Sequence, residues 1–171
     1  VILKNRDTAS TYWQVFGNGF ERLQLAIAQA ELTDGYTLAR TSTTISPTGN
    51  SVTNNQMNAN GDKYIAYCWS EVSGYSKFGS FTHSGSASSV SNLGFKPRFV
   101  LIKSTTSSTT ANWMIFDSER NTNDTIYANS DAAENSGWAV VFENDGFSWA
   151  AGSFGSADYI YAAFADRPGN N

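Results

Sequence analysis

Glu143 and Asp145 come nearest, among the acidic residues of this chain, to the carboxylate pair of a glycoside hydrolase. That chemistry needs two carboxylates on one concave face, about 5 to 10 Å apart. A glucanase of the sandwich type would repeat a carboxylate three residues after the aspartate, and that position is Ser148. An Asn-Asp-Gly sequence is also typical of a tight turn. We therefore interpret Asp145 as a turn residue and predict that the protein is not an enzyme.

Oxygen-bearing side chains alternate in a way that is similar to a calcium loop at Asp117, Glu119, Asn121, Asn123 and Asp124. The central glycine and the closing bidentate glutamate of a helix-loop-helix calcium site are missing from this sequence. We predict at most a loose calcium site with Asp117, Glu119 and Asn121 as ligands, and no other cofactor. The alternative is that Asp117 and Arg120 cap a turn with ordinary surface ion pairs.

His83 is the single histidine, and it lies among serine and glycine residues with no cysteine nearby. A catalytic triad needs a nucleophile and an orienting group around the histidine, and one histidine among many serines does not define one. We predict that His83 is a solvated loop residue.

Aromatic side chains are better candidates for ligand contacts than the carboxylates are. Sugars present apolar C–H faces that stack on Trp and Tyr rings, while Asn, Asp and backbone groups meet their hydroxyls. We predict sugar contacts at four exposed rings: Tyr12, Tyr75, Trp138 and Trp149. Core packing or a subunit interface is the alternative for each of them. The tryptophans in repeated strand phrases are expected to fill cores: Trp13, Trp69 and Trp113.

The elements that must position these residues occur twice in the chain. Three blocks return in the same order: VILKN with WQVF (residues 1–16) as VLIKS with WMIF (100–116), DGYT (34–37) as DGFS (145–148), and YIAYCWSE (64–71) as YIYAAFAD (159–166). Loops of different length separate the blocks in the two copies. This pattern indicates an internal duplication of strands joined by tolerant loops.

The duplication predicts two related β-sandwich repeats, an incomplete one at residues 1–73 and a second at 74–171. The first copy lacks the lead-in phrase GFKP (94–97) and the strand before it. One edge of its sheet is therefore expected to be uncovered and able to pair with another chain. Whether the repeats are separate domains or share one sandwich stays open. Cys68, whose counterpart is Ala163, is expected to fill a small inward-facing slot.

The composition favours an all-β fold, because aromatic content is high at 14%, charged content is low at 15%, and polar turn residues are abundant. Residues of high β propensity between turn signals predict strands at 1–4, 12–16, 22–27, 36–40, 63–70, 77–82, 98–104, 112–117, 125–128, 138–143, 147–150 and 159–165. A short helix at 21–32 is an open alternative, since its apolar residues fall on one helical face. The polar segment 42–60 is predicted to be a long loop and a candidate contact surface.

Charge and hydropathy exclude two classes of partner. The net charge is −4, and the Lys and Arg residues are scattered singly, without the basic stripe that nucleic-acid binding needs. No apolar run approaches the roughly 18 residues of a membrane helix. The sequence begins inside a strand phrase without a secretion signal. We expect a soluble piece of a longer protein that binds neither nucleic acid nor membranes.

Five phrases of the second repeat resemble a bacteriophage virion domain: SGYSKFGSFT (73–82), GFKPRFVLIK (94–103), WMIFDSERN (113–121), NDGF (144–147) and YIYAAFA (159–165). In this order they are similar to an uncharacterised tandem repeat of tail-fibre and other virion proteins, notably of phages of cyanobacteria and marine hosts. The first repeat resembles the family more weakly and departs from its pattern at residues 16–22. The resemblance implies a lectin-like jelly-roll β-sandwich displayed on a virus particle.

The resemblance leads us to expect a non-enzymatic virion protein located outside the cell. It would be a segment of a tail fibre or appendage whose loops contact host-surface glycans. Such appendages multiply weak contacts by self-association, often as trimers. The alternative is a structural module, a capsid-decoration or appendage-building unit that self-assembles with other virion proteins and binds no host ligand.

Overall fold

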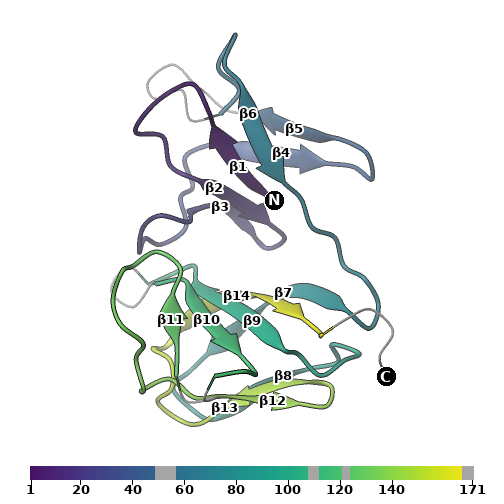
Figure 1. The fold of residues 1–171 in the computed structure, drawn as a ribbon, viewed down its shortest axis with the longest axis vertical. Coiled ribbons are helices and arrows are strands. Elements are labelled where there is room, and N and C mark those ends of the chain that lie inside the picture. Colours follow the sequence, from purple (N-terminus) through teal and green to yellow (C-terminus); the bar gives the residue numbers. More distant parts are fainter. Residues whose placement is uncertain (49–56, 108–111, 121–123, 167–171) are drawn as a thin grey trace.

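The protein is built from β-strands and connecting loops throughout the part of the chain that the structure describes. The computed structural model describes residues 1–48, 57–107, 112–120 and 124–166 (Figure 1). These residues form fourteen strands, and every strand pair is antiparallel. The all-β prediction is confirmed, and the antiparallel sheets are consistent with a β-sandwich.

The strands of the described ranges form four sheets, numbered 1 to 4 here. Sheet 1 pairs β4 (Thr37–Arg40) with β5 (Ile45–Thr48). Sheet 2 has the order β3 (Phe20–Gln24), β2 (Gln14–Gly17), β1 (Ile2–Asn5) and β6 (Tyr64–Tyr67). Sheet 3 has the order β11 (Ile126–Tyr127), β10 (Met114–Asp117), β9 (Phe99–Ser104), β14 (Ala157–Phe164) and β7 (Ser76–His83). Sheet 4 has the order β12 (Val140–Glu143), β13 (Gly146–Trp149) and β8 (Ser88–Ser91).

Apolar clusters join neighbouring sheets face to face. Sheets 1 and 2 share Leu3, Phe16, Leu38 and the loop residue Met57. Sheets 2 and 3 share Val15, Leu23, Trp113 and Ile160. Sheets 3 and 4 share a cluster that includes Val100, Ile102, Phe116, Phe142 and Phe147. Sheets 1 and 2 occupy the upper half of Figure 1 and sheets 3 and 4 the lower half, so each half has its own core and a further core joins them.

Each predicted strand overlaps an observed one, and two observed strands, β5 and β8, were not predicted. β5 lies inside the segment 42–60 that was predicted to be a loop, so that part of the loop prediction is wrong. Residues 49–56 of the same segment lie outside the described residues.

The alternative of a helix at 21–32 is wrong. β3 occupies the start of this segment, and its Leu23 is fully buried. Further along, Leu32 N donates to Arg22 O at 2.9 Å and Glu31 N donates to Thr105 O at 2.7 Å. These amides pair with the far end of the segment and with another segment, not with carbonyls four residues earlier as in a helix. Tertiary contacts therefore override the helical propensity.

The strands that carry the repeated phrases pair in the same register in both halves. In the first half, Ile2 of β1 pairs with Val15 of β2 and with Tyr67 of β6. In the second half, the equivalent Leu101 of β9 pairs with Ile115 of β10 and with Ala162 of β14. Isolated bridges also recur, at Arg22–Leu32 and at Thr125–Asn135. The registers support the duplication, which stays a prediction. Sheets 1 and 2 use strands before residue 73 and sheets 3 and 4 use strands after residue 74, where the boundary was placed.

The two halves differ at one edge. β14 lies between β9 and β7, whereas its counterpart β6 pairs with β1 alone among the described strands. Cys68, which follows β6, is exposed. The prediction of an inward-facing Cys68 is therefore wrong, because no described strand lies beside β6 to enclose it.

Candidate functional site

The predicted sugar contacts lie on separate elements: Tyr12 before β2, Tyr75 before β7, Trp138 before β12 and Trp149 on β13. Tyr12 is 41% exposed. Tyr75 packs edge-on against Phe164 with ring centroids 6.2 Å apart, and Trp138 stacks on Phe154 at 5.9 Å. The four rings are spread over both halves of the molecule and are not gathered in one site.

Trp149 is buried, so the prediction of an exposed ring there is wrong. Its Nε1–H donates to His83 Nδ1 at 3.0 Å, and both rings lie against Phe154. His83 is the last residue of β7 and is also buried, so the prediction of a solvated loop histidine is wrong. The reason is non-local: β7 and β13 belong to facing sheets, and their side chains meet in the core between them.

The predicted calcium ligands are engaged in a turn and in ion pairs. Asp117 accepts hydrogen bonds from Glu119 N at 3.1 Å and Arg120 N at 3.0 Å, and Arg120 Nε donates to its Oδ2 at 2.6 Å. Burial opposes the charge of Asp117, but the hydrogen bonds from Arg120 outweigh it and lower the pKa of this carboxyl. Glu119 faces Arg98 at 3.5 Å, and Asn121 lies outside the described residues.

Within the described ranges, no group of three or more His, Cys, Asp or Glu side chains is placed to hold a metal ion. The arrangement at Asp117 matches the alternative interpretation, a turn capped by Asp117 and Arg120. The calcium site gains no support from these residues.

Asp145 lies in the turn between β12 and β13, as its sequence predicts. Its Oδ1 accepts a hydrogen bond from Gly94 N at 2.6 Å. The neighbouring carboxylate, Glu143, accepts a hydrogen bond from Ser148 Oγ at 2.8 Å. Both carboxylates therefore have structural partners, and the absence of enzymatic activity stays a prediction.

A row of aromatic side chains at the edge of sheet 2 was missed by the sequence analysis. The Tyr67 ring lies 6.0 Å from that of Trp13 and 6.3 Å from that of Trp69, and we call these three residues the aromatic row. Tyr67 is 44% exposed and Trp69 49% exposed. The prediction that Trp69 fills a core is therefore wrong. The available signal was the i, i+2 spacing of Tyr67 and Trp69, which places both side chains on one face of an extended segment.

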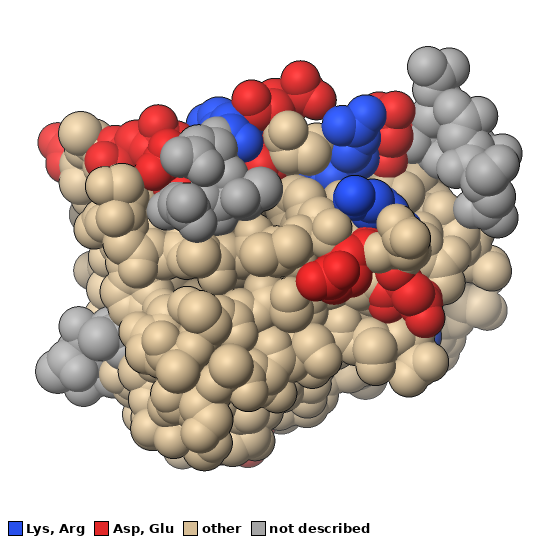
Figure 2. All heavy atoms as spheres, turned by 90° about the horizontal axis from the view of Figure 1, so that it is seen from below, with Lys and Arg blue, Asp and Glu red and all other residues tan. Residues whose placement is uncertain are grey.

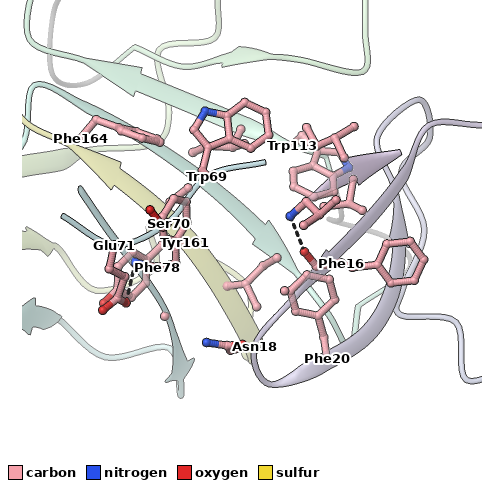
Figure 3. Close-up of a pocket in the computed structure, with 18 of the residues that line it drawn as sticks. Phe16, Asn18, Phe20, Trp69, Ser70, Glu71, Phe78, Trp113, Tyr161 and Phe164 are labelled. Carbon is pink, nitrogen blue, oxygen red and sulfur yellow. Dashed lines mark hydrogen bonds between the residues drawn. The ribbon is translucent and has the colours of Figure 1, made fainter. Parts of the chain in front are cut away.

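A cleft of about 490 Å³ opens between sheets 2 and 3 at the end of the aromatic row (Figure 3). Trp69 lines it from the segment between the two halves, and sheet 3 contributes an apolar wall that includes Phe78, Phe99 and Phe164. A concave and mainly apolar site with a few polar groups is the usual form of a ligand pocket.

The two charged side chains of the cleft, Arg40 and Glu71, are already bonded within the protein. Arg40 Nη2 donates to Gly17 O at 3.0 Å. Glu71 accepts hydrogen bonds from Phe78 N and from Lys77 Nζ, both at 3.3 Å. The cleft is therefore suited to the apolar face of a ligand more than to its charged groups.

Lys103 places an amino group in the interior beside the core that joins sheets 2 and 3. The residue is fully buried, and its Nζ donates to Gln29 O at 2.6 Å and to Ser104 O at 2.7 Å. The Trp113 ring centroid lies 6.0 Å from Nζ. Burial lowers the pKa of Lys103 to about 8. The sequence signal was a lysine at the same place in both copies, Lys4 and Lys103.

Lys103 predicts a pH dependence of stability. Between about pH 8 and pH 10 the unfolded chain keeps the proton that the folded chain has released, so the free energy of unfolding should rise with pH, by at most about 1.4 kcal/mol per pH unit. Burial raises the pKa of Tyr161, which opposes this rise only at higher pH. Urea unfolding at three pH values within this range measures the slope. Lys103→Met should remove it, and an equal slope in both proteins would contradict the assignment.

Charged side chains are sparse on the face seen from below, where both signs mix along the upper border and on the right of the view (Figure 2). This face presents no basic stripe among the described residues, in agreement with the low net charge. The described ranges also contain no helix that could cross a bilayer.

Comparison with curated proteins and with solved structures finds no match to this chain. The model of one family, whose description is "Domain of unknown function (DUF7483)", matches residues 1–168. Because this match spans nearly the whole sequence, the chain belongs to the DUF7483 family.

Proposed function

We propose that this protein is a non-enzymatic virion module, a segment of a bacteriophage tail fibre or appendage that attaches to host-surface glycans. The resemblance of its sequence phrases to phage virion repeats supports a place on a bacteriophage particle. The proposal includes a fold of two related jelly-roll repeats. The single observation that carries the binding function is the aromatic row of Trp13, Tyr67 and Trp69, whose Tyr67 and Trp69 rings are exposed and whose Trp69 lines the cleft.

The aromatic row has the chemistry that a sugar ring requires. Exposed Tyr67 and Trp69 rings, stacked at an interplanar angle of 25°, offer flat apolar surfaces to C–H faces. Ser70 and Asn18 lie at the cleft and can hydrogen-bond hydroxyl groups. Each contact is weak, so several copies of the module on one appendage would be needed for firm attachment.

A glycan array tests this function. Wild-type protein should bind a host-surface polysaccharide saturably, and Trp69→Ala should weaken the binding by about tenfold or more. Val141→Ala, which removes a side chain 49% exposed on β12 in the other half, is the matched control and should bind as the wild type does. Unchanged binding by Trp69→Ala would contradict a site at the aromatic row.

The second candidate is the structural module, which is favoured by the edge of β6 that no described strand pairs with. It predicts self-association, a trimer for example, or contacts with other virion proteins. Sedimentation of the same preparation separates the candidates. An oligomer with saturable glycan binding supports the attachment module, and large assemblies without a glycan signal support the structural one.

A further inference from the structure

The edge of β6 has the features of a strand position that is filled in the other half of the molecule. Arg6 N donates to Lys63 O at 2.8 Å, so the alternation of the antiparallel ladder directs the main-chain groups of Ile65 and Tyr67 toward β1. The N–H and C=O of Ala66 then point away from β1. They face the side on which no described strand pairs with β6.

Burial along the two equivalent strands shows what β6 lacks. On β14, which β7 covers, Ile160, Tyr161 and Ala163 are at most 9% exposed. On β6, Ile65 is 37% and Tyr67 44% exposed. β6 thus leaves apolar side chains as well as main-chain groups accessible, and such an edge is a template for another strand.

We propose that β6 receives an antiparallel strand from another polypeptide, in the place that β7 takes beside β14. The occupant is an extended segment that takes the backbone position and direction of β7, because the matching registers of the two halves make β7 the template for this position. The inference does not depend on glycan binding and goes beyond it.

The sizes of facing side chains specify the occupant further. In the second half the large Tyr161 faces Gly79, where an added Cβ would lie 2.6 Å from the tyrosine Oη, and the small Ala162 faces Phe78. The register places Ala66 where Tyr161 stands, and Tyr67 where Ala162 stands. The order of large and small residues is reversed on β6. The incoming strand therefore carries a small residue opposite Tyr67 and a large one opposite Ala66.

Two peptides of identical composition test this inference with the full chain. One has the sequence of residues 73–84, SGYSKFGSFTHS, and the other exchanges its Phe and Gly, SGYSKGFSFTHS. The exchanged peptide should bind about tenfold more tightly or better, because it avoids overpacking against Tyr67 and fills the space beside Ala66. Binding should also slow hydrogen exchange at the Ala66 amide.

Ala66→Pro locates the binding. Proline removes the outward N–H of Ala66 and is tolerated on edge strands, so this variant should fold and lose the peptide. Equal affinity for both peptides, no binding of either, or undiminished binding by a folded Ala66→Pro variant would each overturn the proposal. If Ala66→Pro does not fold, hydrogen exchange of the wild-type protein is the deciding measurement. An Ala66 amide that the bound peptide does not protect overturns the proposal. A glycan signal without peptide binding overturns this inference alone, and the reverse result overturns only the glycan proposal.

Discussion

Replacing Trp113 with alanine is expected to lower the free energy of unfolding by about 3–5 kcal/mol. Trp113 is 3% exposed and packs with Val15, Leu23 and Ile160 in the core between sheets 2 and 3. Its Nε1–H also donates to Gln24 O at 3.0 Å, and the substitution removes this buried hydrogen bond. The loss should appear as a shift of the urea midpoint measured by far-ultraviolet circular dichroism.

Trp13 is the matched control, because it begins the equivalent strand phrase of the first half. It is partly exposed in the aromatic row, so Trp13→Ala should cost only about 1 kcal/mol. The difference between the two variants reports the packing of one half against the other. Equal losses would contradict the shared core of sheets 2 and 3.

Phe147→Ala is expected to have an effect of similar size, about 3–5 kcal/mol. Phe147 is fully buried between sheets 3 and 4, and its ring centroid lies 5.4 Å from that of Tyr161, 6.0 Å from Trp149 and 6.2 Å from Phe81. Truncation leaves a cavity that these large rings cannot close without leaving their rotamers. Urea unfolding measures the loss.

Tyr36 is the counterpart of Phe147 in the repeated Asp-Gly-aromatic block and serves as its control. Tyr36 is partly buried, and its ring lies 4.8 Å from the Arg22 guanidinium. Tyr36→Ala should therefore cost about 1–2 kcal/mol. A greater loss for Tyr36→Ala than for Phe147→Ala would contradict the placement of the main core between sheets 3 and 4.

Local sequence was sufficient to predict most strands and failed where a strand depends on its neighbour. β8 reads Ser-Ser-Val-Ser, which carries a single residue of high β propensity. It pairs with β13 because Gly146 allows close approach: a Cβ there would lie 2.0 Å from Val90 O. β5 contains Pro47, which removes a backbone donor and weakens the strand signal.

The candidate site was harder to predict than the fold, because exposure depends on how sheets stack. Trp69 and Trp113 both lie in or beside repeated strand phrases, yet one is 49% and the other 3% exposed. Sheet 2 covers Trp113, whereas the described chain places no strand beside β6 to shield Trp69. Sequence periodicity gives the face on which a side chain lies and does not say whether another sheet covers it.

The place of β14 between β9 and β7 in sheet 3 has a consequence for biosynthesis. Its neighbour β7 is distant in sequence, since the paired Thr82 and Asp158 are 76 positions apart. On the ribosome, β7 and β9 therefore emerge well before the strand that joins them, and both wait with open edges. Pairing of such high contact order is slow, on the order of milliseconds to seconds. A nascent chain stalled before β14 would present two open strand edges, and such edges are templates for aggregation.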